Sequence, residues 1–215
     1  KIYKNELYKY NPDMILYCVF IGNDLYDLKL PKINPSSSLK NKSSNTSLKT
    51  FLRKNIHLYS FVVDRIKTIP FIRSKLIKYG FAHGLIGSYI IDVLKPNLNE
   101  EYKLRWSKFF NITKSLKNSG GKLILVIIPT REQVIDIRLK KAVNQLGYNL
   151  NNINPTFPNE KIFQFCKQEN IKCIDLLPKF KSKSKHKKLY FDIDPHFNKN
   201  GHELAAEIIL NNLEE

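Results

Sequence analysis

The side chains best suited to chemistry gather near the C-terminus, in the segment Asp192–Asn198 (DIDPHFN). Asp194 stands two residues before His196. A carboxylate so placed can orient an imidazole and stabilise its protonated form, which is what a general base requires. Asp192 is a weaker candidate for the same acid. A simpler interpretation stays open, in which the segment is a surface loop and Asn198 caps the helix that follows.

A second segment, Gly22–Asn23–Asp24, ends an apolar run near the N-terminus. The Asn23 amide could donate a hydrogen bond to a developing oxyanion, and Gly22 would let a substrate approach the main chain. The alternative is a turn that serves only to leave the strand. Ligands of open α/β sheets bind at the carboxyl ends of the strands, so the two segments are expected to share that rim.

The pattern of apolar residues predicts the strands and helices that would position these segments. Strands buried on both faces are predicted at Met14–Ile21 (MILYCVFI), Lys122–Ile128 (KLILVII) and Ile171–Leu176 (IKCIDL). Helices are predicted from the Asn99 cap to Gly120–Gly121, around Phe163–Cys166, and over Gly201–Leu213. This alternation predicts a parallel α/β sheet with helices on both faces.

The remaining sequence predicts one domain over residues 1–215, with a loop and helical insertion at 26–98. Within it, Asn34–Ser47 is polar and loop-like, and Leu48–Leu94 repeats apolar residues at helical spacing. Cys18 lies inside an apolar run and is expected in the core. Cys166 and Cys173 flank a helix-to-strand turn without the spacing of a zinc site.

The formal net charge of +17 raises the question of a nucleic-acid partner, but only six of the 36 Lys and Arg side chains are Arg. Sites that read nucleic acids favour the planar Arg fork. The chain is also rich in Asn and Ile, so a general compositional bias is favoured over a nucleic-acid surface. An anionic glycan or lipid head group remains an alternative partner. No apolar run reaches the length of a membrane span.

Taken together, three stretches resemble the SGNH/GDSL hydrolase family. The stretch 11–24 (NPDMILYCVFIGND) is similar to that family's third conserved block, and 127–133 (IIPTREQ) to the strand end and loop of many exported members. The stretch 189–209 (LYFDIDPHFNKNGHELAAEII) resembles the last block, in which an Asp–His pair precedes a helix that Gly and His begin. The resemblance implies a three-layer, flavodoxin-like α/β/α fold.

The resemblance also implies roles. Asn23 with Gly22 would form the oxyanion site, His196 would be the general base, and Asp194 its orienting acid. Many members place that Asp three residues before the His, where this chain has Ile193. The two-residue spacing is similar to the alginate-acetylation branch, whose members transfer acetyl groups to polysaccharides.

The family's nucleophile stands in a Gly-Asp-Ser motif after its first strand, and this chain contains no such motif. We therefore expect that strands 3, 4 and 5 are present, that the first strands and the serine lie upstream of Lys1, and that Ser88 is the alternative nucleophile. The leading interpretation is a serine ester hydrolase or O-acyltransferase, acting on an ester such as an acetylated carbohydrate, with no metal or organic cofactor. The resemblance suggests an exported or membrane-tethered protein. The alternative is a non-catalytic domain of the same fold that binds an anionic polymer.

Overall fold

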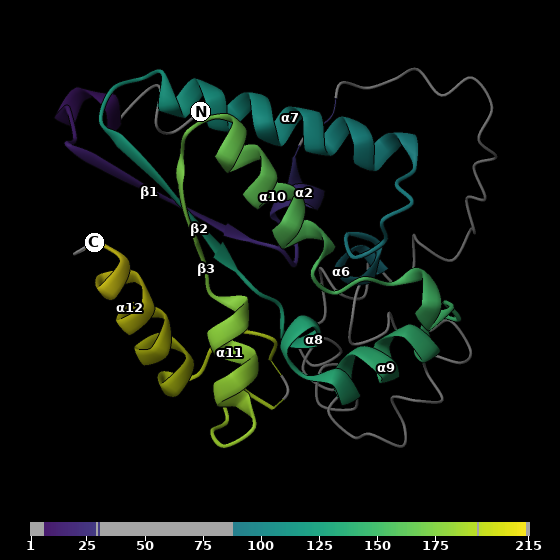
Figure 1. Ribbon diagram of the computed structural model, residues 1–215. Helices are drawn as coiled ribbons and strands as arrows, with labels where there is room; N and C mark the ends of the chain where they lie inside the picture. Colours follow the sequence, from purple (N-terminus) through teal and green to yellow (C-terminus); the bar gives the residue numbers. More distant parts are fainter. Residues whose placement is uncertain (1–6, 29, 31–87, 193, 214–215) are drawn as a thin grey trace, which may run out of the picture. The chain divides into compact units, whose positions relative to one another are not determined.

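The computed structural model describes residues 7–28, 30, 88–192 and 194–213. Within that part, three parallel strands form one sheet in the order β1-β2-β3 (Figure 1). The loop and helical insertion expected at 26–98 lies mostly outside the described residues. Among the described helices, none has both the length and the apolar character needed to cross a membrane.

The described elements follow the predicted alternation of strands and helices. In chain order they are η1 (Leu7–Tyr10), β1 (Met14–Phe20), α2 (Asp24–Asp27), α6 (Ser88–Asp92), α7 (Glu100–Lys117), β2 (Lys122–Ile128), α8 (Arg131–Val134), α9 (Asp136–Gln145), η2 (Leu150–Asn152), α10 (Phe157–Gln168), β3 (Lys172–Asp175), α11 (Leu177–Ser184) and α12 (Lys199–Leu213). The three predicted strands are thus confirmed to within two residues at each end.

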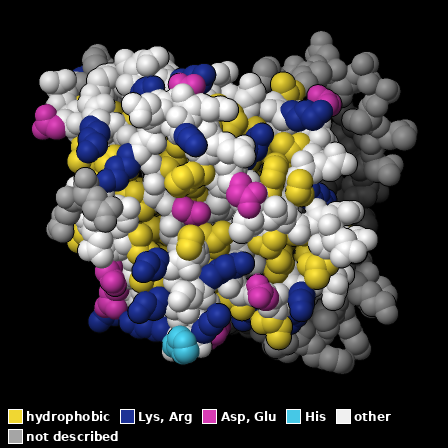
Figure 2. Space-filling model, viewed as in Figure 1, with side chains coloured by type: hydrophobic (Ala, Val, Ile, Leu, Met, Phe, Trp, Pro, Cys, Tyr) yellow, Lys and Arg dark blue, Asp and Glu magenta, His cyan; other side chains and the backbone are white. Residues whose placement is uncertain are grey.

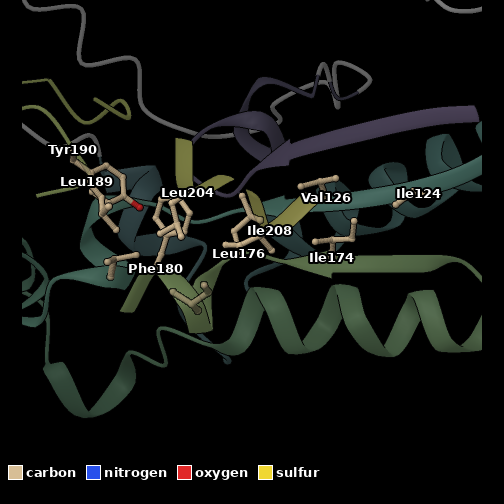
Figure 3. Close-up of a cluster of buried hydrophobic side chains, with 11 residues drawn as sticks. Ile124, Val126, Ile174, Leu176, Phe180, Leu189, Tyr190, Leu204 and Ile208 are labelled. Carbon is tan, nitrogen blue, oxygen red and sulfur yellow. The ribbon is translucent and has the colours of Figure 1, made fainter. Parts of the chain in front are cut away.

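Because side chains alternate across a strand, the register defines the two faces of the sheet. Ile124 lies opposite Leu16 on β1 and Lys172 on β3, and Val126 lies opposite Cys18 and Ile174. Helix α12 covers part of this face. The side chains of Leu204 and Ile208 pack in one buried cluster with Ile124, Val126 and Ile174, and the cluster continues into α11 (Figure 3).

Helices α7 and α10 cover the opposite face. The Asn99 side chain accepts a hydrogen bond from the Tyr102 amide at 2.9 Å, so the predicted cap of α7 is confirmed. Phe109 of α7 stacks on Tyr17 of β1, with ring centroids 6.1 Å apart. A disulfide joins Cys166 of α10 to Cys173 of β3, across a Cα–Cα distance of 6.3 Å. The disulfide ties α10 to the sheet that it covers.

Strand β1 differs from the expectation of burial on both faces. Met14 and Leu16 are 40% and 43% exposed, and Cys18 is an exposed free cysteine rather than a core residue. Only Val19 of the strand is fully buried. The physical reason is position, since β1 is the edge of the described sheet and α12 packs over β2 and β3.

An apolar, uncharged edge strand templates association through its unpaired N–H and C=O groups. We therefore predict that the 215-residue chain self-associates through β1 despite its net charge of +17. Leu16→Lys places a charge on the exposed face of that edge and should shift the sedimentation profile toward monomer. Ile137→Lys, which changes an exposed side chain on α9, is the matched control and should not. A wild-type chain that sediments as a stable monomer would contradict the prediction.

Candidate functional site at the carboxyl ends of the strands

A pocket of about 570 Å³ opens where the three strands end. The ends are held together by main-chain hydrogen bonds from Ile21 N to Ile128 O at 3.1 Å and from Leu176 N to Ile127 O at 3.2 Å. The lining comes from the strand ends, the loop before α12 and α12 itself: Phe20, Asn23, Asp24, Ile128, Leu176, Phe191, Pro195, His196, Phe197, His202, Ala205 and Ile209. The two segments singled out in the sequence therefore meet at one cleft.

The Asp194–His196 pair forms as expected. Asp194 Oδ1 contacts His196 Nδ1 and also accepts a hydrogen bond from the His196 main-chain N–H at 2.8 Å. With Nδ1 held in this way, Nε2 is the ring nitrogen left to exchange a proton with another group. Both side chains are exposed, at 74% for His196 and 55% for Asp194, so water reaches the pair. Asp192 instead contacts Lys188 and takes no part in the pair.

The loop that carries this pair is closed at both ends. Tyr190 and Phe197 form an antiparallel bridge, and the Phe191 N–H donates to His196 O at 3.1 Å. Phe197 stacks on the buried Phe180 of α11 at 4.6 Å between ring centroids. The Tyr190 hydroxyl donates to Pro129 O at the end of β2, at 3.1 Å. His196 thus projects from a short loop whose two ends are fixed to the core.

The start of α12 supports the same loop. Asn198 Nδ2 donates to Lys188 O at 2.9 Å, and Asn198 Oδ1 accepts from the Gly201 N–H at 3.1 Å. A Cβ at Gly201 would lie 2.2 Å from Leu189 O, so only glycine fits at this crossing. The proposed capping role of Asn198 and the catalytic interpretation of the loop are therefore compatible. His202 packs edge-on against Phe197 at 5.7 Å and lines the pocket.

A buried ion pair holds the loop from the β2 side. Arg131 and Glu132 begin α8, are 4% and 1% exposed, and approach each other at 3.4 Å. Arg131 Nη1 donates to Phe191 O at 3.3 Å and to Asp192 O at 3.1 Å. Reasoning from the sequence missed this role, because nothing in a Thr-Arg-Glu helix start shows that the arginine is buried.

The Gly22–Asn23 segment forms the other side of the pocket. Asn23 Nδ2 donates to Asp27 Oδ2 at 2.7 Å, which uses one of its two amide protons. The second amide proton of Asn23 has no hydrogen-bond acceptor among the described residues. The Asp24 carboxylate accepts from the Phe20 N–H at 2.8 Å and fixes the turn. Gly22 leaves room for the Phe20 ring, since a Cβ there would lie 2.3 Å from that ring. The expectation that Gly22 serves substrate approach therefore has a packing alternative.

The described lining of this pocket contains no serine, threonine or cysteine. Ser88, considered in the sequence as a nucleophile, begins α6 and is not among the lining residues. No group of three or more His, Cys, Asp or Glu side chains is arranged to hold a metal in the part of the chain that the structure describes. The described lining can therefore supply an imidazole able to exchange a proton and an amide able to donate a hydrogen bond.

The described strands form a parallel sheet, and an Asp–His pair and an Asn lie together at its strand ends. The family model described as "SGNH hydrolase-like domain, acetyltransferase AlgX" matches residues 92–215. The chain belongs to this family. The match covers β2, β3 and the Asp–His loop, and the α/β fold is the one expected. Searches of curated proteins and of solved structures gave no match.

The hydrogen bonds to Asp194 have a consequence for its ionisation. The His196 main-chain N–H, then the His196 ring and the Arg131 charge, hold the pKa of the Asp194 carboxyl below its ordinary value of about 3.9. Because the pKa is lowered in the folded state, the contact with His196 is fully present above about pH 4 and is lost as the pH falls through the lowered pKa. Carboxyl ¹³C NMR should record this titration, and a midpoint above pH 4 would contradict it.

Arg131 should matter for stability as well as for placing the loop. We predict that Arg131→Met lowers the free energy of unfolding by about 3–5 kcal/mol, because it leaves the Glu132 carboxylate buried without its cation. Adding Glu132→Gln should recover part of that loss, since no buried charge then remains. Urea denaturation measures both effects, and Arg138→Met, on the surface of α9, is the control. Equal losses in the single and double variants would rule out the ion pair as the cause.

Proposed function

We propose that this domain provides the general base and one oxyanion donor of a serine O-acyltransferase or esterase that acts on acylated carbohydrate. The observation that carries the proposal is the shared pocket, in which Asn23 from the end of β1 and His196 from the loop before α12 line one cleft. Family membership supports ester chemistry of this kind. The acetyltransferase in the family's description supports acyl transfer, and the carbohydrate acceptor is part of the proposal.

The proposed first step is attack of a serine hydroxyl on the ester carbonyl. His196 Nε2 takes the serine proton as the serine Oγ–carbon bond forms, and Asp194 stabilises the imidazolium. The free N–H of Asn23 donates to the carbonyl oxygen as it becomes negative. When the carbon–oxygen bond of the ester breaks, His196 returns the proton to the departing alcohol. The serine is then acylated.

The second step repeats this chemistry with a new acceptor. His196 takes a proton from water or from a sugar hydroxyl, and that oxygen attacks the acyl-serine carbonyl. The serine Oγ–carbon bond then breaks, and His196 returns the proton to the serine oxygen. Water gives hydrolysis and a sugar hydroxyl gives acyl transfer. We propose that the serine belongs to a segment upstream of Lys1, because the described pocket lining supplies no hydroxyl or thiol nucleophile and the chain has no Gly-Asp-Ser. The exposure of His196 is compatible with a further segment packing beside it.

The proposal is tested in the full-length gene product. We predict that His196→Ala lowers the kcat for acetyl release from p-nitrophenyl acetate by about 10⁴-fold or more, as loss of a triad base does. Asn23→Ala should lower it by about 10²-fold, the effect of losing one oxyanion donor. Asn144→Ala, which changes an exposed asparagine of α9 that does not line the pocket, is the matched control and should retain activity.

Serine-directed labelling gives a second readout of the same proposal. A fluorophosphonate should label the full-length product at one serine, and His196→Ala should abolish that labelling. The 215-residue chain alone should not be labelled. Labelling of the isolated chain at Ser88 would show that the nucleophile lies within it, and a full-length product that neither turns over esters nor reacts would leave the domain without the proposed chemistry.

A further inference from the structure

A second hollow, of about 320 Å³, lies between α8–α9 and the segment that leads from α11 into the site loop. We call it the basic groove. Its charged lining residues are Arg131, Arg138, Lys185, Lys187, Lys188 and Asp192, and His186 also lines it. Figure 2 shows Lys and Arg side chains gathered over α11 and the turn that follows it, beside a histidine. The groove is thus concave as well as cationic, which distinguishes it from a solvated run of lysines.

Part of this positive charge is already neutralised within the protein. The carboxylate contacts of the groove are Arg131 with Glu132 at 3.4 Å, Lys187 with Glu203 at 3.7 Å, and Lys188 with Asp192. Arg138 and Lys185 form no ion pair with a carboxylate among the described residues, although the charge of Arg138 acts on Asp192 and helps to lower the pKa of its carboxyl. The groove therefore offers two cations, one from α9 and one from the end of α11, that lie outside the described ion pairs.

Two unpaired cations match the charge of a phosphate monoester. At neutral pH such a group carries about −1.5 to −2 charges and presents three strong acceptor oxygens. Arg binds phosphate through its planar fork and Lys through a compact charge, so the two side chains suit one phosphate together. A carboxylate carries a single charge and would leave one of the cations unneutralised. We propose that the basic groove binds a phosphate group.

The groove adjoins the catalytic pocket, because Phe191 lines both. A phosphate held by Arg138 and Lys185 would therefore anchor a molecule whose acyl ester reaches His196. This extension rests on the proposed function, and it assigns the substrate to esters borne on a phosphorylated molecule. No bond to phosphorus forms or breaks, since the phosphate serves only to bind and orient.

Binding is tested without any turnover, on the full-length gene product, with glycerol 3-phosphate as the probe. Amide NMR or calorimetry at low salt should show saturable binding. Arg138→Gln/Lys185→Gln should weaken it by about tenfold or more, the loss expected when charge-assisted hydrogen bonds are removed. Lys140→Gln/Lys183→Gln removes the same charge from exposed positions of α9 and α11 outside the groove lining, and should weaken binding by no more than about twofold through the general field.

Three results would overturn the proposal. Equal weakening in the two double variants would mean that net charge alone attracts the probe. Equal affinity for glucuronate would mean that the groove takes a carboxylate. Binding to phosphatidylcholine vesicles that contain phosphatidylglycerol, without binding to glycerol 3-phosphate, would make this face a membrane-contact surface.

Failure of the groove proposal can be told apart from failure of the proposed function. A full-length product that binds phosphate but has no esterase activity would refute the proposed function and not the phosphate site. A full-length product that has esterase activity but does not bind phosphate would refute the phosphate site alone.

Discussion

The candidate site depends on one constraint, the closure of the loop between Tyr190 and Phe197 above the ring of Phe180. The exposed Asp194–His196 pair has little packing of its own to fix it in place. Its position is determined by the two residues that close the loop, and these are fixed by aromatic contacts and by the hydrogen bond from Tyr190 to the end of β2. The pair is therefore held at a defined place on the sheet even though it stands in water.

Charge is distributed around this loop in two layers with different physical effects. Arg131 and Glu132 lie beneath it, where burial makes their attraction strong. Removing either partner alone would therefore lower the stability of the fold. The lysines of 185–188 lie outside, where water and salt screen them. Because Arg131 donates to the Phe191 and Asp192 carbonyls, the buried layer supports the closed loop that carries His196. The outer layer can only act on molecules that approach, and this is why the unpaired Arg138 and Lys185 point to a ligand rather than to stability.

Much of the fold could be predicted because it depends on local patterns. The apolar run 122–128 and the Asn99 cap each determine an element whatever surrounds it, and both were correct. The burial of Cys18 was wrong because burial depends on what packs over β1, and no pattern within the strand reveals that. The pairing of Asp194 with His196 could be predicted from spacing, whereas the supporting Arg131 could not, since its partners lie about 60 residues further along the chain. The roles of Asn23, Gly22, Asp194 and His196 in catalysis remain proposals.

The closed loop also separates residues that can be substituted from residues that packing holds fixed. Outside it, Gly201 has no space for a side chain, and Phe197 and Tyr190 are packed on the core. Between the closing residues, Asp192 and Pro195 face solvent or the pocket and contribute no side chain to the buried cluster. Substitutions there can alter what the pocket accepts at little cost to folding. The lining of the pocket can thus vary at the loop while the packed residues that hold the histidine stay in place.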